Sequence, residues 1–347
     1  MRKNFAKCLT LGCIAICFCL TFFTNQAAAK DKVYKWRFQT YAVPGSVGFK
    51  GFEKAIEDLK VATNGRIQIK LFGVGSLVGP FDQLDGVSKG IFEGAFNAGA
   101  YYAGKDPAFA AYFSLIGVWD KPSDVKVWAH HFGGNELISQ LYSKYKVQYL
   151  GPALVGAEPI MSNVPLKSLE DFKGIKIRAA GGLSSELFTR LGASPVKMGG
   201  GDLYTGLDTK VVDAAEFVSL AENYDMGLHE VSKYVLYPSF HGPIAMCDVI
   251  VNQKKWNSLP EDLQAIVKMW MYNVDANFDY MSDAESIKAL QKMKEKGLEQ
   301  TTLSSEDMQK AKDISLEIAL EWAQKSEMSG KMVESILNFL RLKGTVE

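Results

Sequence analysis

The hydrophobic positions of this chain alternate between two spacings, one typical of strands and one typical of helices. Residues 66–71 alternate polar and apolar side chains, and the Asn64-Gly65 turn precedes them, as expected for a half-buried strand. Apolar residues between 49 and 59 instead recur every three or four positions, which predicts a helix. Further strand patterns occur at 33–40, 91–96 and 147–150. This alternation of strands and helices predicts an α/β fold.

A second series of strands and helices follows Gly151-Pro152, where we expect the chain to cross from one lobe to another. The same spacings predict strands at 175–178, 194–198 and 211–217, and helices at 184–191 and 202–207. Two later strand patterns, 234–237 and 249–252, could return to the first lobe. The expected lobes are 30–152, with about 243–257 returning to it, and 153–242.

The spacing of apolar residues within 258–297 predicts one long helix. Ser258-Leu259-Pro260-Glu261 has the form of a capping box with proline in the first turn. At 1.5 Å per residue this helix would reach about 57 Å before Gly297, long enough to brace two lobes. Two amphipathic helices are expected within 303–347, and their apolar stripes could pack on this chain or on a second copy.

The first 29 residues have the three parts of an export signal. Three basic residues precede an apolar run at 9–23, and an alanine triplet at 27–29 supplies small residues for cleavage. The run of about fifteen residues is shorter than the roughly twenty needed to cross a membrane, which favours a cleaved signal peptide over a retained anchor helix. The mature chain is therefore expected in the periplasm. Cys247 would be its only cysteine, so no internal disulfide is expected.

The composition argues against two classes of protein. Hydrophobic residues make up 47% of the chain and charged residues 22%, enough to bury a core, which argues against disorder. The formal net charge is zero, with 39 Lys and Arg against 39 Asp and Glu. Nucleic-acid-binding proteins normally carry a basic excess to replace phosphate counterions, so no nucleic-acid partner is expected.

Signals of catalysis are weak in this sequence. Residues 99–105 carry the glycines and lysine of a phosphate-binding loop, but Asp106 stands where Ser or Thr would bind magnesium. The four histidines lack the spacing of a zinc site, and neither G-x-S-x-G nor H-E-x-x-H occurs. We therefore expect a protein that is not an enzyme. An exported α/β enzyme acting on a small acid is the alternative.

Two charged side chains stand at the ends of predicted strands, where open α/β sheets bind their ligands. Arg178 ends one strand, and a guanidinium there can hold a carboxylate or sulfonate through two parallel hydrogen bonds. Glu216 ends another strand in a loop that could face the same cleft. A carboxylate inside an anion pocket implies an intervening cation of the hard, oxygen-liganded type. Taken alone, each residue is more often an ordinary surface charge than a ligand-binding group.

Several ordered motifs resemble those of one family. They are SLEDFKGIKIR at 168–178, LGASPV at 191–196, GDLYTGL at 201–207, VVDAAEF at 211–217, GVGSL at 73–77 and LPEDL at 259–263. Over nearly the whole mature chain, this set is similar to the extracytoplasmic solute receptors of tripartite ATP-independent periplasmic (TRAP) transporters. Three further motifs are closest to the branch that binds 2-oxo or 2-hydroxy monocarboxylates with a metal ion: AYY at 100–102, GGDLYT at 200–205 and YPSFH at 237–241.

The resemblance implies two α/β lobes of the periplasmic binding protein kind that close around one small acid. It implies that Arg178 grips the substrate carboxylate and that Glu216 binds the metal. It also implies that the backbone carbonyl of Phe217 reaches metal or ligand. Tyr101 and Tyr102 match tyrosines near the pocket, and we also expect a contact to substrate from the residue at 97, an asparagine (Asn97). The cation is expected to be sodium or calcium.

This sequence departs from that branch at two positions. Gly242 stands where a second metal-binding glutamate is expected, and Glu158 stands near the position of an expected glutamine. Because the exchange would keep the charge of the site, Glu158 is a candidate both for the metal and for the substrate. The alternatives are that no metal binds or that the substrate has changed, for instance to a small sulfonate such as isethionate.

These observations predict a periplasmic receptor that captures a small organic acid and delivers it to integral membrane subunits. A receptor that docks onto a membrane sensor kinase is the alternative role. A homodimer is compatible with the sequence but is not required by it.

Overall fold

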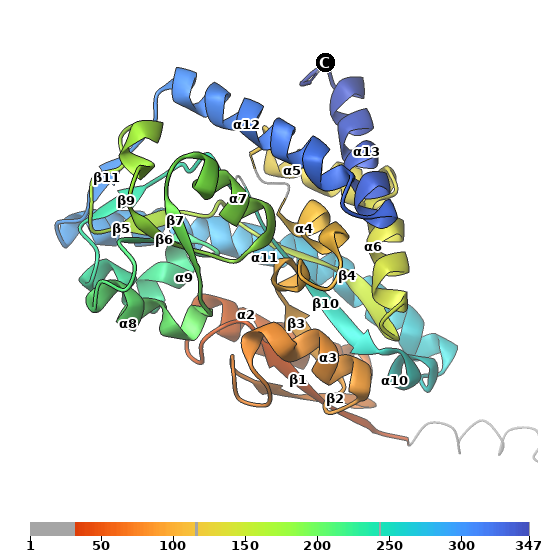
Figure 1. Cartoon of the computed structure of the whole chain (residues 1–347). Helices are drawn as coiled ribbons and strands as arrows, with labels where there is room; N and C mark the ends of the chain where they lie inside the picture. The colour runs from red at the N-terminus through yellow and green to blue at the C-terminus, as the bar shows by residue number, and fades with distance from the viewer. Residues whose placement is uncertain (1–31, 115–116, 243, 347) are drawn as a thin grey trace, which may run out of the picture.

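The computed structural model describes residues 32–114, 117–242 and 244–346 and shows two β-sheets with helices around them (Figure 1). The signal peptide expected at 1–29 lies outside the described residues. Within the described part of the chain, no helix combines the length and the apolar character needed to cross a membrane. We call the parts built on the two sheets the first and the second lobe.

The first sheet has the strand order β2-β1-β3-β10-β4. β1 pairs in parallel with β2 and β3, whereas β10 is antiparallel to β3 and β4. Trp36 and Phe38 alternate with more exposed residues along β1 and are buried in the core, as the two-residue period requires. The strands are β1 (Tyr34–Thr40), β2 (Ile67–Phe72), β3 (Gly94–Asn97), β4 (Val147–Val155) and β10 (Ala245–Asn252).

The second sheet has the order β11-β9-β5-β8-β6-β7. β6 is parallel to both β7 and β8, so the carboxyl ends of these three strands lie at one edge. β5 runs antiparallel to β8 and β9. The strands are β5 (Ile160–Ser162), β6 (Lys176–Ala179), β7 (Ser194–Lys197), β8 (Ala214–Glu216), β9 (Tyr234–Leu236) and β11 (Glu299–Thr301).

Two details of the strand prediction are wrong. β4 continues through Gly151 and Pro152, because both residues pair with β10, and it leaves the first sheet only after Val155. The register shift of β10 beside Val249 is the kind of irregularity that tolerates a proline. The pattern at 234–237 forms β9 of the second sheet instead of returning to the first.

Helices cover the sheets of both lobes. The first lobe has α2 (Val47–Ala62), α3 (Gln83–Lys89), α4 (Pro107–Phe113), α5 (Pro122–His131) and α6 (Gly134–Ser143). The second lobe has α7 (Gly182–Arg190), α8 (Leu203–Asp208) and α9 (Leu220–Asp225), and α10 (Gln253–Asn257) follows β10. Short 3-10 helices are η1 (Pro80–Asp82), η2 (Gly99–Tyr102), η3 (Leu169–Phe172), η4 (Gly200–Asp202) and η5 (Leu228–Glu230).

The long helix α11 (Glu261–Glu295) contacts both lobes. Its 35 residues span about 52 Å, and it passes behind both sheets in Figure 1. It packs on β4 and α2 of the first lobe and on α9 of the second. The capping box predicted at Ser258 is wrong. α11 begins after Pro260 without a side-chain cap, and the Ser258 hydroxyl donates to the Lys255 carbonyl (2.7 Å) instead.

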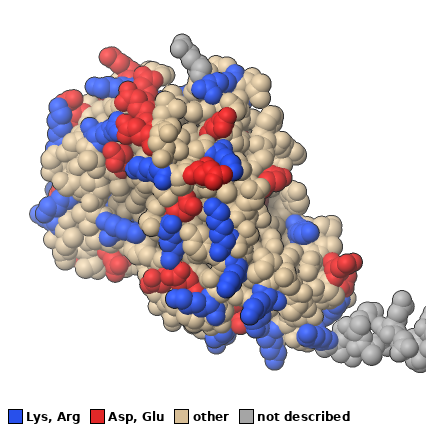
Figure 2. Space-filling model, turned by 45° about the vertical axis from the view of Figure 1, so that its right-hand side comes forward, with Lys and Arg blue, Asp and Glu red and all other residues tan. Residues whose placement is uncertain are grey.

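Surface charges of both signs are mixed. Figure 2 shows Lys and Arg side chains beside Asp and Glu over much of one face. Exposed pairs such as Lys60 with Glu57 and Lys288 with Glu285 are each worth about 0–1 kcal/mol. The stability of the fold therefore depends mainly on its buried apolar residues.

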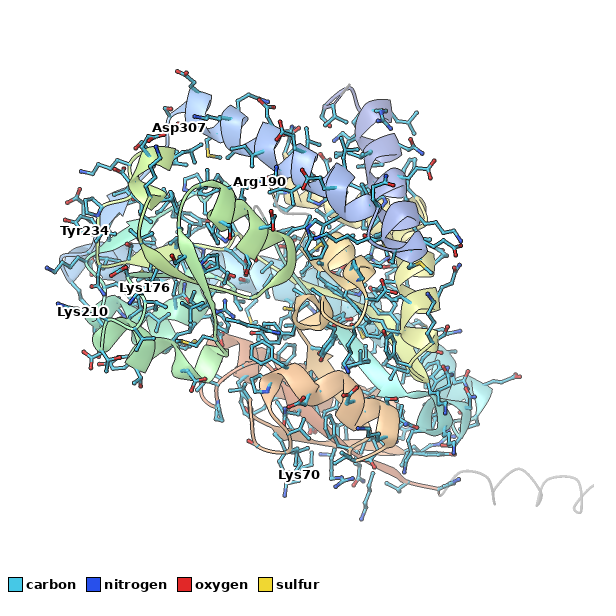
Figure 3. The ribbon with its side chains drawn as sticks, in the orientation of Figure 1. Lys70, Lys176, Arg190, Lys210, Tyr234 and Asp307 are labelled. Atoms are coloured by element: carbon cyan, nitrogen blue, oxygen red, sulfur yellow. The ribbon has the colours of Figure 1, made fainter. Side chains whose placement is uncertain are left out.

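The last two helices, α12 (Ser305–Ala323) and α13 (Glu327–Leu342), bury the apolar stripes for which the sequence did not decide between this chain and a second copy as the packing partner. α13 packs on α4 and α6 of the first lobe, and α12 packs on α7 of the second. Arg190 of α7 extends toward α12, where Glu317 and Glu321 pair with it (Figure 3). The stripes of these two helices are thus covered within the chain itself, and the helices connect the lobes a second time.

A buried carboxylate also connects the lobes. Glu222 of α9 is 1% exposed, and one of its oxygens accepts a hydrogen bond from the Gly48 N–H (2.9 Å) in the first turn of α2. Its other oxygen has no hydrogen-bond partner among the described residues. Burial raises the pKa of the Glu222 carboxyl from its ordinary value of 4.5 to about 7.

We expect the variant Glu222→Gln to lose part of the pH dependence of stability. Between about pH 4.5 and 7 the folded protein holds a proton that the unfolded chain has released, so the free energy of unfolding falls as pH rises through this window. The difference has an upper bound of about 3 kcal/mol. Urea unfolding at pH 5 and pH 8 measures it, with Asp208→Asn at the exposed end of α8 as control. Equal pH-dependent losses in wild type and Glu222→Gln would contradict this assignment.

Candidate ligand and cation site

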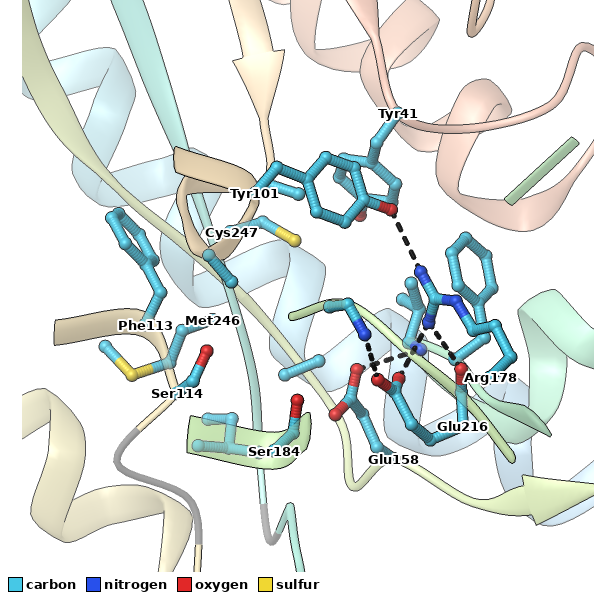
Figure 4. Close-up of a pocket in the computed structure, with 17 residues that line it drawn as sticks. Tyr41, Tyr101, Phe113, Ser114, Glu158, Arg178, Ser184, Glu216, Met246 and Cys247 are labelled. Atoms are coloured by element: carbon cyan, nitrogen blue, oxygen red, sulfur yellow. Dashed lines mark hydrogen bonds and ion pairs between the residues drawn. The ribbon is translucent and has the colours of Figure 1, made fainter. Parts of the chain in front are cut away.

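A cavity of about 50 Å³ lies between the lobes, with room for a few non-hydrogen atoms (Figure 4). Residues of both lobes, of β10 and of the segment between β4 and β5 line it. They are Tyr41, Ala98, Ala100, Tyr101, Phe113, Ser114, Glu158, Arg178, Ala180, Ser184, Glu216, Phe217, Val218, Ile244, Ala245, Met246 and Cys247.

The parallel pairing of β6 and β8 brings Arg178 and Glu216 together. Arg178 pairs with Ala215 in the sheet register, so both charged side chains emerge at the carboxyl edge. They are 1% and 2% exposed. Arg178 Nη1 lies 2.8 Å from Glu216 Oε2 and 2.6 Å from the Glu216 carbonyl oxygen, and the Ala180 N–H donates to Oε1 (2.7 Å). Burial raises the pKa of the Glu216 carboxyl, although the Arg178 cation opposes this.

The Arg178 guanidinium has limited capacity for a ligand. Its Nε donates to the Met198 carbonyl (2.9 Å) and its Nη2 to the Tyr101 hydroxyl (3.2 Å), which adds to the two bonds to Glu216. Four of its five N–H groups are thus occupied among the described residues, and the fifth is on Nη2. The two parallel hydrogen bonds expected from Arg178 to one acid group are not available in this arrangement. An incoming anion instead meets Nη2 and the Tyr101 hydroxyl.

Two tyrosine hydroxyls supply further hydrogen-bond donors. Tyr101 accepts from Arg178, so its own proton is free to be donated. The Tyr41 hydroxyl is buried and has no hydrogen-bond partner among the described residues. Burial raises the pKa of both phenols, which keeps them protonated at neutral pH. Tyr41 was not predicted from the sequence, where nothing marks it as a site residue.

The side chain of Phe217 stacks over the arginine. Its ring centre lies 5.2 Å from Arg178 Cζ. Gly200 makes room for this ring, because a Cβ at that position would lie 2.5 Å from Phe217 Cζ. Gly200, the first residue of η4, therefore serves close packing at the cavity wall.

Glu158 occupies the space beside Gly242. Its backbone N–H donates to the Gly242 carbonyl (2.9 Å), and a Cβ on Gly242 would lie 3.0 Å from Glu158 Oε2. Oε1 accepts from the Val218 N–H (3.1 Å), and Val218 adopts a φ of 37°, which is rare for a β-branched residue. The carboxylate therefore approaches the point that a side chain at 242 would otherwise fill.

Three potential cation ligands converge at this end of the cavity. Glu158, Glu216 and His241 each offer one atom, and these atoms lie within 4.8 Å of one another. His241 is fully buried, its Nδ1 lies 2.5 Å from Ser239 Oγ, and its Nε2 lies 3.5 Å from Glu158 Oε2 without a hydrogen bond. Two carboxylates and an unpartnered ring nitrogen are donors that fit a cation. The sequence motif contained His241, but its role was not predicted.

Asn97 and Tyr102 lie outside the lining of the cavity. The Tyr102 hydroxyl donates to Asn97 Oδ1, and Asn97 Nδ2 donates to Asp248 Oδ1 (3.0 Å) and Tyr142 Oη (3.0 Å). This buried network holds η2, which carries Tyr101, against the first sheet. A direct contact of either residue with substrate stays a prediction.

Two lobes with a small cavity between them are the architecture of the periplasmic binding protein class. Residues 38–325 match the family of bacterial extracellular solute-binding proteins, family 7 (DctP). The chain belongs to this family, whose members include the solute receptors of TRAP transporters. The fold class and the family predicted from the sequence are thereby confirmed.

Similar proteins support this assignment. Over 315 residues the chain is 31% identical to the monocarboxylate 2-oxoacid-binding periplasmic protein of a Nostoc species, covering 90% of this chain and 85% of the relative. It is 26% identical to a TRAP periplasmic solute binding protein of Pseudoalteromonas atlantica solved with sodium and pyruvate (TM-score 0.80; 90% and 95% covered). A receptor from Colwellia psychrerythraea solved with calcium and pyruvate is also 26% identical (TM-score 0.78; 89% and 94% covered).

Proposed function

We propose that this protein is a periplasmic receptor, without catalytic activity, for a small 2-oxo or 2-hydroxy monocarboxylate bound together with a cation. One observation carries the proposal: Arg178 is the only Lys or Arg among the described residues that line the cavity. One buried guanidinium matches one acid group. The 2-oxoacid named for the Nostoc relative and the pyruvate bound by the two similar structures are ligands of this kind.

The polar contacts support a carboxylate beside Arg178. The Nη2 group and the Tyr101 hydroxyl lie 3.2 Å apart, so one carboxylate oxygen can accept from both. The Tyr41 hydroxyl is available for a second oxygen of the acid. A 2-oxo or 2-hydroxy oxygen would also give the acid a second donor to the cation.

The rest of the cavity favours a short apolar group. Figure 4 shows Phe113 and Met246 on the side away from Arg178, and Ile244 also lines the cavity. A second carboxylate placed there would be buried without a cationic partner, which costs several kcal/mol. This supports a monocarboxylate over a dicarboxylate.

The charges support a divalent cation. Arg178 contributes one positive charge, and Glu158, Glu216 and the bound acid contribute three negative ones, which leaves a sum of −2. Calcium neutralises this sum in a buried site, whereas sodium leaves −1. Glu158 and Glu216 would hold the ion through their carboxylate oxygens, and the carbonyl of Phe217 stays a predicted further ligand.

We expect Glu158→Gln to weaken calcium binding about tenfold or more, because one anionic ligand is lost. Calorimetric titration of calcium in the presence of the acid measures the effect. Glu170→Gln, which changes an exposed carboxylate of the second lobe, is the matched control. A calcium affinity that is unchanged in Glu158→Gln would show that this residue does not hold the ion.

Mass spectrometry of the ligand that copurifies with the protein tests the proposed class directly. A thermal-shift panel of 2-oxo acids, 2-hydroxy acids, dicarboxylates and sulfonates should give the largest stabilisation with a monocarboxylate. A ligand at 100 times its Kd contributes about 2.7 kcal/mol to stability. Stronger stabilisation by a sulfonate or dicarboxylate would overturn the ligand class, and turnover of the bound acid would favour the enzyme alternative.

The proposed role in transport follows from closure of the lobes. Because both lobes contribute to the cavity, a bound acid would favour the closed arrangement over the open one. The membrane subunits of the transporter would then receive the loaded, closed receptor.

A further inference from the structure

Two serine hydroxyls face the cavity at the end away from Arg178. Ser114 follows α4 of the first lobe as its last cap and is 2% exposed. Ser184 lies in the first turn of α7 of the second lobe and is 1% exposed. Figure 4 shows both side chains with their oxygen atoms toward the interior of the cavity, on the side of Met246. Neither hydroxyl holds the carboxylate or the cation in the proposed function.

Close packing of α4 on α7 brings these two serines to the same part of the cavity. Gly182, the first residue of α7, has a φ of 64°, and a Cβ there would lie 2.8 Å from the Cβ of Ala110 on α4. Ser114 is one turn beyond Ala110 on the same face of α4. Ser184 is two residues beyond Gly182. The two hydroxyls therefore belong to different lobes and flank one contact between them.

The hydrogen-bonding capacities of the two hydroxyls are complementary. Ser184 Oγ donates its proton to the Gly181 carbonyl (3.0 Å), so toward the cavity this oxygen can only accept. The backbone N–H of Ser114 donates to the Ala110 carbonyl (2.7 Å), whereas its hydroxyl makes no hydrogen bond to any described residue. The Ser114 hydroxyl is therefore available as a donor. One hydroxyl group of a ligand could donate to Ser184 and accept from Ser114.

This end of the cavity holds no charge that could pair with an ionic group. The charged residues of the described lining are Glu158, Arg178 and Glu216, which Figure 4 shows on the side away from Ser114 and Met246. A carboxylate or ammonium group beside Ser114 would be buried without a partner. An alkyl group there would leave the Ser114 hydroxyl unpaired, which is also unfavourable. A neutral hydroxyl group avoids both costs.

We propose that Ser114 and Ser184 select an acid that carries a hydroxyl group on its third carbon. With the carboxylate of the acid beside Arg178 and the 2-oxo or 2-hydroxy oxygen beside the cation, the third carbon points toward the two serines. Phe113 and Met246 would contact the carbon atoms of the ligand. Because the serines belong to different lobes, the shared hydroxyl would also favour closure. This inference rests on the proposed function and narrows its ligand class.

Two acids that differ only at the third carbon test the selectivity of the wild-type protein. 3-Hydroxy-2-oxopropanoate carries a hydroxyl group where 2-oxobutanoate carries a methyl group of nearly the same size. In calorimetric titrations with calcium present, we expect a Kd at least tenfold lower for the hydroxy acid, because the methyl group leaves buried hydrogen-bonding groups unpaired. Equal affinities, or tighter binding of 2-oxobutanoate, would overturn the inference.

The variants Ser114→Ala and Ser184→Ala test the two residues separately. Each should reduce the preference for the hydroxy acid to about threefold or less, while the affinity for 2-oxobutanoate stays equal or increases. A general structural defect would instead weaken the binding of both acids alike. Ser185→Ala, next to Ser184 on α7 but outside the cavity lining, is the matched control and should keep the wild-type preference. An undiminished preference in both Ser114→Ala and Ser184→Ala would show that these hydroxyls do not select the ligand.

The same titrations separate this inference from the proposed function. If pyruvate and 2-oxobutanoate bind and the hydroxy acid gains nothing over them, the receptor function stands and only the role of the two serines fails. If none of these acids binds while a sulfonate or a dicarboxylate does, the proposed ligand class fails, and this inference fails with it.

Discussion

Replacement of Arg178 by alanine is expected to weaken binding of the acid by about 3–5 kcal/mol, or roughly two to four orders of magnitude in Kd. The variant leaves the carboxylates of Glu216 and of the ligand in a buried cavity without the guanidinium that both would contact. Arg178→Lys should restore binding only in part. An ammonium group cannot reach the Met198 carbonyl, Glu216 and the Tyr101 hydroxyl with the geometry of a guanidinium.

Isothermal titration calorimetry with the copurified acid measures this loss. Arg190→Ala is the matched control, because Arg190 lies in the same lobe but pairs with α12 at the surface. Thermal unfolding of each variant separates a loss of affinity from a loss of fold. An unchanged Kd in a folded Arg178→Ala protein would remove the assignment of Arg178 to the ligand.

Replacement of Phe52 by alanine should lower the free energy of unfolding by about 3–5 kcal/mol, the usual cost of deleting a buried phenylalanine. Phe52 of α2 is fully buried and stacks on Phe96 of β3 and Phe278 of α11, with ring centres 4.0 and 4.4 Å away. Loss of the ring leaves a cavity where the first lobe meets the long helix.

Urea denaturation of wild type and Phe52→Ala gives this difference. Phe132→Ala is a suitable control, since Phe132 is 45% exposed and should cost much less. Equal losses in the two variants would show that the stacked rings at the contact with α11 are not a major source of stability.

The strands and helices could be predicted where the local pattern of hydrophobic residues determines them. The strands that became β2 and β6 have a clear two-residue periodicity, and the strand ends predicted at Arg178 and Phe217 lie within one residue of the ends of β6 and β8. The extent of β4 beyond Gly151 could not be predicted, because it depends on pairing with β10, almost a hundred residues later. The start of α11 after Pro260 was missed because Ser258, the predicted cap, ends α10 instead, and its hydroxyl donates to the Lys255 carbonyl.

The site was predictable only in part, for a similar reason. Tyr101 and Tyr102 are adjacent in sequence, yet in the tight turn of η2 one faces the cavity and the other faces the Asn97 network. Tyr41 and His241 join the site through tertiary contacts between distant segments. Neither residue has a sequence pattern that would reveal this position.

The close fit of Glu158 against Gly242 couples these two positions. A Cβ at 242 would lie 3.0 Å from Glu158 Oε2 and 3.1 Å from Glu158 Cβ, so a glutamate there would require the Glu158 side chain to shift by a few tenths of an ångström. Single exchanges at either position should therefore be harmful where the paired exchange is tolerated.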